Sequence, residues 1–168
     1  MSKRVARIGI FIALAMIFSY IEVLIPFSFG IPGVKLGVAN IVVVTGLYML
    51  KPQEVFFISI LRILLIGLLF GNVMTLSYSL AGGILSFVVM YIFKKLGSFS
   101  IIGVSAAGGV FHNLGQIIVA AFILKNEKIL YYFPVLIIAG VVTGILIGFV
   151  SDKVIKTLKI QDFSENLK

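Results

Sequence analysis

The chain has 168 residues, of which 61% are hydrophobic and only 12% charged, and its formal net charge is +8. Soluble domains carry about a quarter of their residues as charged side chains, so this composition excludes an ordinary soluble protein and indicates one that lies in a bilayer. The basic excess does not indicate nucleic-acid binding, because the lysines and arginines fall at the ends of apolar stretches and not on one soluble face. Cysteine is absent, which excludes disulfides and thiolate metal sites.

Apolar stretches follow one another along the chain, each near the ~20 residues that a helix needs to cross the hydrocarbon core, although the second is shorter. They predict an all-α, polytopic membrane protein, a six-transmembrane-helix bundle that forms a single integral membrane domain over residues 1–168. A polar cytoplasmic tail is expected over about 152–168. The expected spans are 5–25, 36–50, 54–71, 74–93, 99–124 and 132–151.

The first stretch begins with basic residues, as a secretory signal peptide does, but its apolar run continues through Ile25 with no small-residue cleavage site after it. We therefore expect a retained first helix. Ala6, Gly9 and Ala13 share one face of this helix at helical spacing. That face either docks a partner or packs within the chain.

The distribution of basic residues predicts the orientation. With a cytoplasmic N-terminus, ten basic residues fall on the inner side and three in the outer loops, which is the asymmetry that the positive-inside rule describes. Both termini are then cytoplasmic. The inner residues are Lys3, Arg4, Arg7, Lys51, Lys94, Lys95, Lys153, Lys156, Lys159 and Lys168, and the outer ones are Lys35, Lys125 and Lys128.

A glycine-rich loop, "FGIPGVKLGVAN" at 29–40, follows the first helix. Gly33 and Gly37 allow backbone to approach a ligand closely, and Pro32 stiffens the loop. Lys35 and the free amides at the start of the next helix would together seat a carboxylate or phosphate. The loop is therefore expected to cap a binding pocket, unless it is only an ordinary well-capped turn.

Glycine pairs in "SLAGGI" at 79–84 and "SAAGGV" at 105–110 fall midway through the fourth and fifth spans, where they could face each other and bring the two helices into close contact. The sixth span contains Gly140, Gly144 and Gly148, a ridge of small residues at helical spacing. This ridge predicts close packing, either within the chain or against a partner helix.

Polar side chains inside a membrane are costly, so they normally face the bundle interior or a water-filled cavity. Several amides and the only histidine are expected at one depth in the outer half, which predicts a ligand pocket there. Arg62 is expected deeper, as a pocket floor that binds a ligand anion, as a gate, or as a structural donor to backbone carbonyls. His112 either contacts the ligand or has a proton-linked role, or it forms an interhelical hydrogen bond. The predicted substrate-binding residues are Lys35, Asn40, Arg62, Asn72, His112, Asn113 and Gln116.

The stretches "PGVKLGVANIVVV", "SLAGGILS" and "GGVFHNLGQ" resemble the signature stretches of the bacterial Gx transporter family, often labelled heptaprenyl diphosphate synthase component I. The resemblance covers nearly the whole chain. It implies a likeness to the substrate-binding S components of energy-coupling factor transporters, with six helices, cytoplasmic termini and an outer pocket. S components commonly dock an energising transmembrane subunit through spaced alanines on helix 1, a position that the small residues from Ala6 to Ala13 would match. The bacterial cytoplasmic membrane is the expected location.

We expect a substrate-binding subunit for uptake of a small molecule that is anionic, flavin-like or isoprenoid-linked. Its other partners would be membrane lipids and an energising subunit with ATPases, with no nucleic acid and no cofactor. The alternative is a non-catalytic accessory subunit of a polyprenyl diphosphate synthase or of a quinone or flavin redox system. Catalysis of the condensation is not expected, because magnesium needs several oxygen ligands and the sole aspartates, Asp152 and Asp162, lie in the tail.

Overall fold

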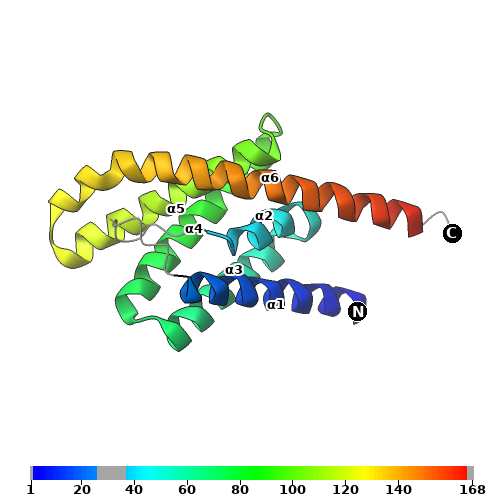
Figure 1. Cartoon of the computed structure of the whole chain (residues 1–168), viewed down its shortest axis with the longest axis horizontal. Helices are drawn as coiled ribbons and strands as arrows, with labels where there is room; N and C mark the ends of the chain where they lie inside the picture. Colours follow the sequence, from blue (N-terminus) through cyan, green and yellow to red (C-terminus); the bar gives the residue numbers. More distant parts are fainter. Residues whose placement is uncertain (1, 26–36, 166–168) are drawn as a thin grey trace.

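The computed structural model of the chain describes residues 2–25 and 37–165, and all regular elements in these two ranges are helical. The predicted all-α class is confirmed for this part of the chain. Figure 1 shows the elements, which are α1 (Ser2–Leu24), α2 (Asn40–Met49), α3 (Pro52–Phe70), α4 (Val73–Leu96), α5 (Ile101–Leu124), the 3-10 helix η1 (Glu127–Tyr132) and α6 (Phe133–Glu165).

Five helices of the described residues are long and apolar enough to cross a membrane, namely α1, α3, α4, α5 and α6. The exception is α2, whose 10 residues rise only about 15 Å, half the thickness of the hydrocarbon core. The expectation of spanning helices therefore holds for five of the six predicted spans. The second, expected over 36–50, contains a helix too short to cross by itself.

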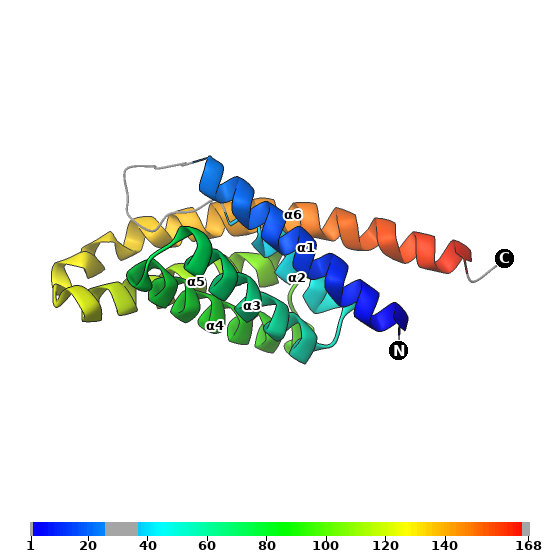
Figure 2. The same cartoon turned by 90° about the horizontal axis from the view of Figure 1, so that it is seen from below.

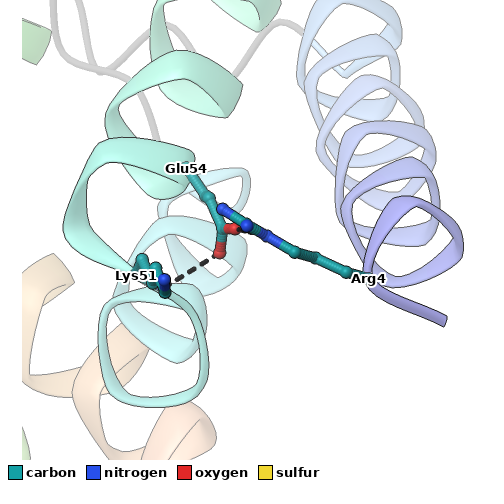
Figure 3. A network of polar contacts seen from close by, with 3 residues as sticks. All are labelled: Arg4, Lys51 and Glu54. Atoms are coloured by element: carbon teal, nitrogen blue, oxygen red, sulfur yellow. Dashed lines mark hydrogen bonds and ion pairs between the residues drawn. The ribbon is translucent and has the colours of Figure 1, made fainter. Parts of the chain in front are cut away.

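Contacts at one end of the bundle define how the first helices run. The Arg4 side chain of α1 forms an ion pair with Glu54 in the first turn of α3, and the second oxygen of Glu54 accepts a hydrogen bond from the Lys51 backbone amide at 3.0 Å (Figure 3). Helices α1 and α3 thus begin at the same end and run in the same direction. Helix α2 lies between them in sequence and ends at Met49, just before α3 begins.

We call this end the basic end, since Arg4, Lys51 and Lys94 lie there. Lys94, near the end of α4, donates to the Leu47 carbonyl in the last turn of α2 and lies 5.1 Å from the Tyr48 ring centroid. A lysine at a helix C-terminus interacts favourably with the negative end of the helix dipole. This contact fixes the end of the short α2 against α4.

Helix boundaries follow the local sequence. Pro52 stands in the first turn of α3 and Pro134 in the first turn of α6, where a missing amide hydrogen costs nothing. Helix α4 ends before Gly97, whose φ of 72° is the left-handed conformation that glycine adopts readily. The Ser100 hydroxyl then accepts from the Gly103 amide at 3.1 Å and begins α5.

The last helix is longer than predicted. The sixth span was expected to end at 151, yet α6 continues through Glu165 and has 33 residues, about 50 Å. Neither glycine nor proline follows Gly148, so nothing local ends the helix. Ser151 and Ile155 are fully buried, and the Ser151 hydroxyl donates to the Ile41 carbonyl at 3.4 Å. The start of the predicted tail therefore packs on the bundle, while the rest of α6 projects past it at the basic end (Figures 1 and 2).

The glycine ridge of α6 packs against α5 within the chain. A Cβ added to Gly144 would lie 2.6 Å from the Ala106 Cα atom, and one added to Gly148 would lie 2.7 Å from the Ile102 Cα atom. Such distances leave room only for hydrogen, so the two backbones are in direct contact. Of the two alternatives for the ridge, the structure contains the intramolecular one.

Close contact between α4 and α5 is also present, but the glycine pairs do not face each other as expected. Gly82 packs against His112, whose carbonyl oxygen would lie 2.7 Å from an added Cβ, while Gly108 packs against Met90. The antiparallel register of the two helices is offset. Only one glycine of each pair meets the other helix, since Gly83 packs against Ile63 of α3 and Gly109 against the Gly140 backbone of α6.

The largest buried apolar cluster lies toward the basic end, between α2, α3, α4, α5 and α6. We call it the core cluster. It consists of Val43, Val44, Leu47, Val55, Phe87, Met90, Val104 and Ile147.

Candidate functional site

A cavity of about 350 Å³ lies at the centre of the bundle, and each of the helices α1 to α6 contributes to its wall. Its lining is mixed, because hydroxyl, amide and ionisable groups alternate with apolar side chains. The polar side chains are Ser19, Glu22, Asn40, Arg62, Asn72, Thr75, Ser79, Ser86, Ser105, His112, Asn113 and Thr143.

The cavity is elongated along the bundle. Its lining on α4 extends from Thr75 to Met90, about 22 Å along the helix axis. Met90, Val44 and Ile147 close the basic end, and all three belong to the core cluster. Thr75 and Asn72 at the other end are exposed, so the cavity reaches the surface there.

Arg62 is the buried cation of this wall, with 8% of its surface exposed. Its Nη1 atom donates to the Ser19 hydroxyl at 3.4 Å and its Nη2 atom to the Asn40 amide oxygen at 3.5 Å. Both hydrogen bonds are at the long limit. Its Nε atom has no partner among the described residues. Arg62 thus lies level with Asn40, and the expected alternative of a bond to backbone carbonyls is not formed in the described part of the chain.

The Glu22 carboxylate of α1 lies beside the start of α2. Its Oε1 atom accepts from the Val38 backbone amide at 2.8 Å, where the positive end of the helix dipole stabilises a carboxylate. An anion seat was predicted at this helix start, and the chain's own carboxylate fills it. Lys35, Pro32 and Gly33 lie outside the described residues.

Gly37 is described, has a φ of 71° and lines the cavity just before α2. Its left-handed conformation is one that residues with a Cβ rarely adopt. This glycine therefore shapes the entry to α2 at the cavity wall.

His112 and Asn113 of α5 both line the cavity, but they face different neighbours. The Asn113 Nδ2 atom donates to the Leu136 carbonyl of α6 at 2.8 Å, and His112 lies against Gly82 of α4. Gln116 also lies against Gly82, but it is 9% exposed and absent from the cavity lining. The structure therefore brings His112 and Asn113, but not Gln116, to the cavity.

Asn72 has a structural role at the cavity mouth. Its side-chain oxygen accepts from the Thr75 amide at 2.8 Å, and the Thr75 hydroxyl accepts from the Asn72 amide at 2.9 Å. This reciprocal pair is a capping box that begins α4. Capping of α4 therefore explains why residue 72 is polar. Asn72 also lies on the cavity rim.

Hydroxyl groups are the part of the lining that the sequence did not single out. Ser19, Ser86 and Thr143 come from three helices, and Ser86 is only 4% exposed. Serine and threonine are common in membrane helices, where they bond neighbouring helices, so no single one stands out. The available signal is the spacing of Ser79 and Ser86, which places both hydroxyls on one face of α4.

The predicted docking residues lie away from the cavity. Ala6, Gly9 and Ala13 are exposed on α1, and a Cβ added to Gly9 would meet nothing within 4 Å. Across the described ranges, no cluster of histidine, aspartate or glutamate side chains could hold a metal ion.

A protein-family model described as heptaprenyl diphosphate synthase component I matches residues 11–154, which include all the described cavity-lining residues. No curated protein and no solved structure matches the chain. Since the matched region covers most of the sequence, the chain belongs to the heptaprenyl diphosphate synthase component I family.

Proposed function

We propose that this chain is the substrate-binding membrane subunit of an uptake system and that its central cavity holds the transported small molecule. The cavity volume of about 350 Å³ is the observation that carries the proposal, because small-molecule sites commonly have about 300–1,000 Å³ and a few polar groups among apolar ones. Since all six α-helices contribute to its wall, the cavity is a feature of the whole bundle.

The cavity is closed at one end only, which supports a direction from which the ligand enters. The core cluster seals the basic end, whereas exposed residues such as Asn72 lie at the other end. The positive-inside rule assigns the basic end to the cytoplasm, so the mouth would face outward. A molecule would enter from outside and leave only after the bundle rearranges.

We assign the drive for this rearrangement to a partner subunit. The exposed small residues Ala6, Gly9 and Ala13 on α1 offer a face on which another helix could pack closely. We assign this face to an energising transmembrane subunit, as the likeness to energy-coupling factor S components implies. The bacterial cytoplasmic membrane is the corresponding location.

A second candidate function is a non-catalytic accessory subunit, because the family description names one component of a synthase. In that case the partner of this chain would be the catalytic subunit of a synthase. The uptake function is the better match for the cavity, because an accessory subunit that only binds a synthase needs no small-molecule site of its own.

The test is mass spectrometry of the purified chain, released from detergent under native conditions, to detect a retained small molecule. Ser79→Leu places a larger apolar side chain in the cavity, and Ser77→Leu makes the same change on the same helix outside the cavity lining. Retention in the wild type and in Ser77→Leu, with loss in Ser79→Leu, is the expected result. Equal retention in both variants would show that the cavity is not the binding site.

A further inference from the structure

Arg62 has a charge that the described residues do not neutralise by contact. It is 8% exposed, its two hydrogen bonds go to the neutral side chains of Ser19 and Asn40, and its Nε atom has no partner in the described ranges. Glu22 is the carboxylate that shares the cavity wall, but it accepts from the Val38 amide and forms no ion pair with Arg62.

An arginine in this position normally has an anionic partner. The guanidinium group stays charged in proteins, and a charged side chain within a membrane helix costs several kcal/mol unless it is paired or solvated. Its five N–H donors form a planar fork, and the edge formed by Nε and one Nη matches two oxygens of a carboxylate or phosphate. Each Nη atom has two N–H groups and gives one to Ser19 or Asn40, so the remaining Nη donors at the cavity wall are left for such a group.

We infer that Arg62 is the anion-binding centre of the cavity and that the ligand carries a carboxylate or phosphate group. This inference rests on the proposed function and adds the chemical class of the substrate. The remainder of the ligand would be a small molecule that fits a cavity of about 350 Å³. Ser19 and Asn40 hold the guanidinium in place when the ligand is absent.

The chain contains three arginines, Arg4, Arg7 and Arg62, so an arginine-selective reagent provides its own internal control. The full-length chain in lipid nanodiscs is labelled with phenylglyoxal, and adducts at each arginine are quantified by peptide mass spectrometry. Labelling is repeated with phenyl phosphate, with benzoate, and with benzyl alcohol as an uncharged molecule of similar shape. Exposed Arg7 reports any general effect on the reagent.

We expect phenyl phosphate, benzoate or both to slow labelling of Arg62, by about tenfold at roughly ten times the dissociation constant, with no change at Arg7. Protection by one anion alone assigns the ligand to that class. Equal slowing by benzyl alcohol, no slowing by either anion, or no labelling of Arg62 in their absence would each overturn the inference.

A variant set gives a second measurement. Arg62→Gln should weaken anion-dependent thermal stabilisation, followed by circular dichroism, by at least about tenfold in apparent affinity, because it removes charge-assisted hydrogen bonds. Arg62→Lys keeps the charge without the fork and should lose less, and Arg7→Gln removes a charge outside the cavity and should lose none. If a retained molecule is lost in Ser79→Leu but kept in Arg62→Gln, the proposed function stands and the anion-binding role of Arg62 does not.

Discussion

The seam between α5 and α6 should tolerate no side chain at Gly140. A Cβ added there would lie 2.9 Å from both the carbonyl carbon and the oxygen of Gly109 and 2.9 Å from the Val110 nitrogen, all backbone atoms. Carbon atoms in ordinary contact are about 3.5–4.0 Å apart, so Gly140→Ala would push the helices about 0.6 Å or more from each other. A gap of that size removes a quarter or more of the dispersion energy of each contact across the seam.

Overpacking of this kind typically costs about 1–3 kcal/mol, and the better helix propensity of alanine returns about 0.5–1 kcal/mol. We therefore expect Gly140→Ala to lower the free energy of unfolding by about 0.5–2 kcal/mol. The matched control is Gly9→Ala on α1, where an added Cβ meets nothing within 4 Å and only the propensity gain applies.

The assay is unfolding of both variants by sodium dodecyl sulfate in mixed micelles, followed by circular dichroism because the chain has no tryptophan. Gly9→Ala should be as stable as the wild type or slightly more stable. If Gly140→Ala unfolds at the same detergent fraction as Gly9→Ala, the direct backbone contact between α5 and α6 is not present in the membrane protein.

Asn72→Ala should lower the free energy of unfolding by about 1 kcal/mol through loss of the α4 cap, measured in the same detergent titration. Glu54→Gln breaks the ion pair with Arg4, whose side chain is 59% exposed, so it should have little effect on global stability yet raise hydrogen exchange in the first turns of α1. Asn113→Ala removes the donor to the Leu136 carbonyl and should cost about 0.6 kcal/mol, the mean for interhelical hydrogen bonds in a membrane protein; no change would mean that water replaces the bond.

Features that depend on local chain chemistry could be predicted from the sequence. Apolar length gave the five long helices, Pro52 and Pro134 marked helix starts, and Gly97 marked a helix end. Asn40, His112 and Asn113, which were expected at a similar depth, line one cavity, and their role in ligand binding stays a prediction. These signals lie within single helices and need no knowledge of how the helices pack.

Features that depend on register between helices could not be predicted. Arg62 was expected deeper than Asn40, but α2 begins only at Asn40 and so brings this residue level with the arginine. The offset that places Gly82 against His112 is set by the relative shift of α4 and α5, which glycine spacing alone does not fix. The length of α6 was underestimated because polarity was taken as its end, although no helix breaker follows Gly148.

The two sides of the cavity are held together by different forces. On one side, α5 and α6 touch through backbone atoms along Gly140, Gly144 and Gly148, a contact that cannot be loosened without losing many dispersion interactions at once. On the other side, α1 has the smallest buried share of the five long helices. Its polar contacts are few, with Arg4 at the basic end and Ser19 and Glu22 beside the cavity.

Under the proposed function, this difference would connect ligand binding to motion of α1. An anion on Arg62 would compete with the Ser19 hydroxyl for the guanidinium, and the 3.4 Å bond between them is already long. Loss of that bond would leave α1 with the hydrogen bond from the Val38 amide to Glu22 beside the cavity and with its apolar packing around Ala15. Ala6, Gly9 and Ala13, which form the proposed docking face, are exposed on the same helix. Ligand binding in the cavity would therefore act on the helix that the proposed partner contacts. An uptake subunit needs this kind of coupling between its ligand site and its partner site.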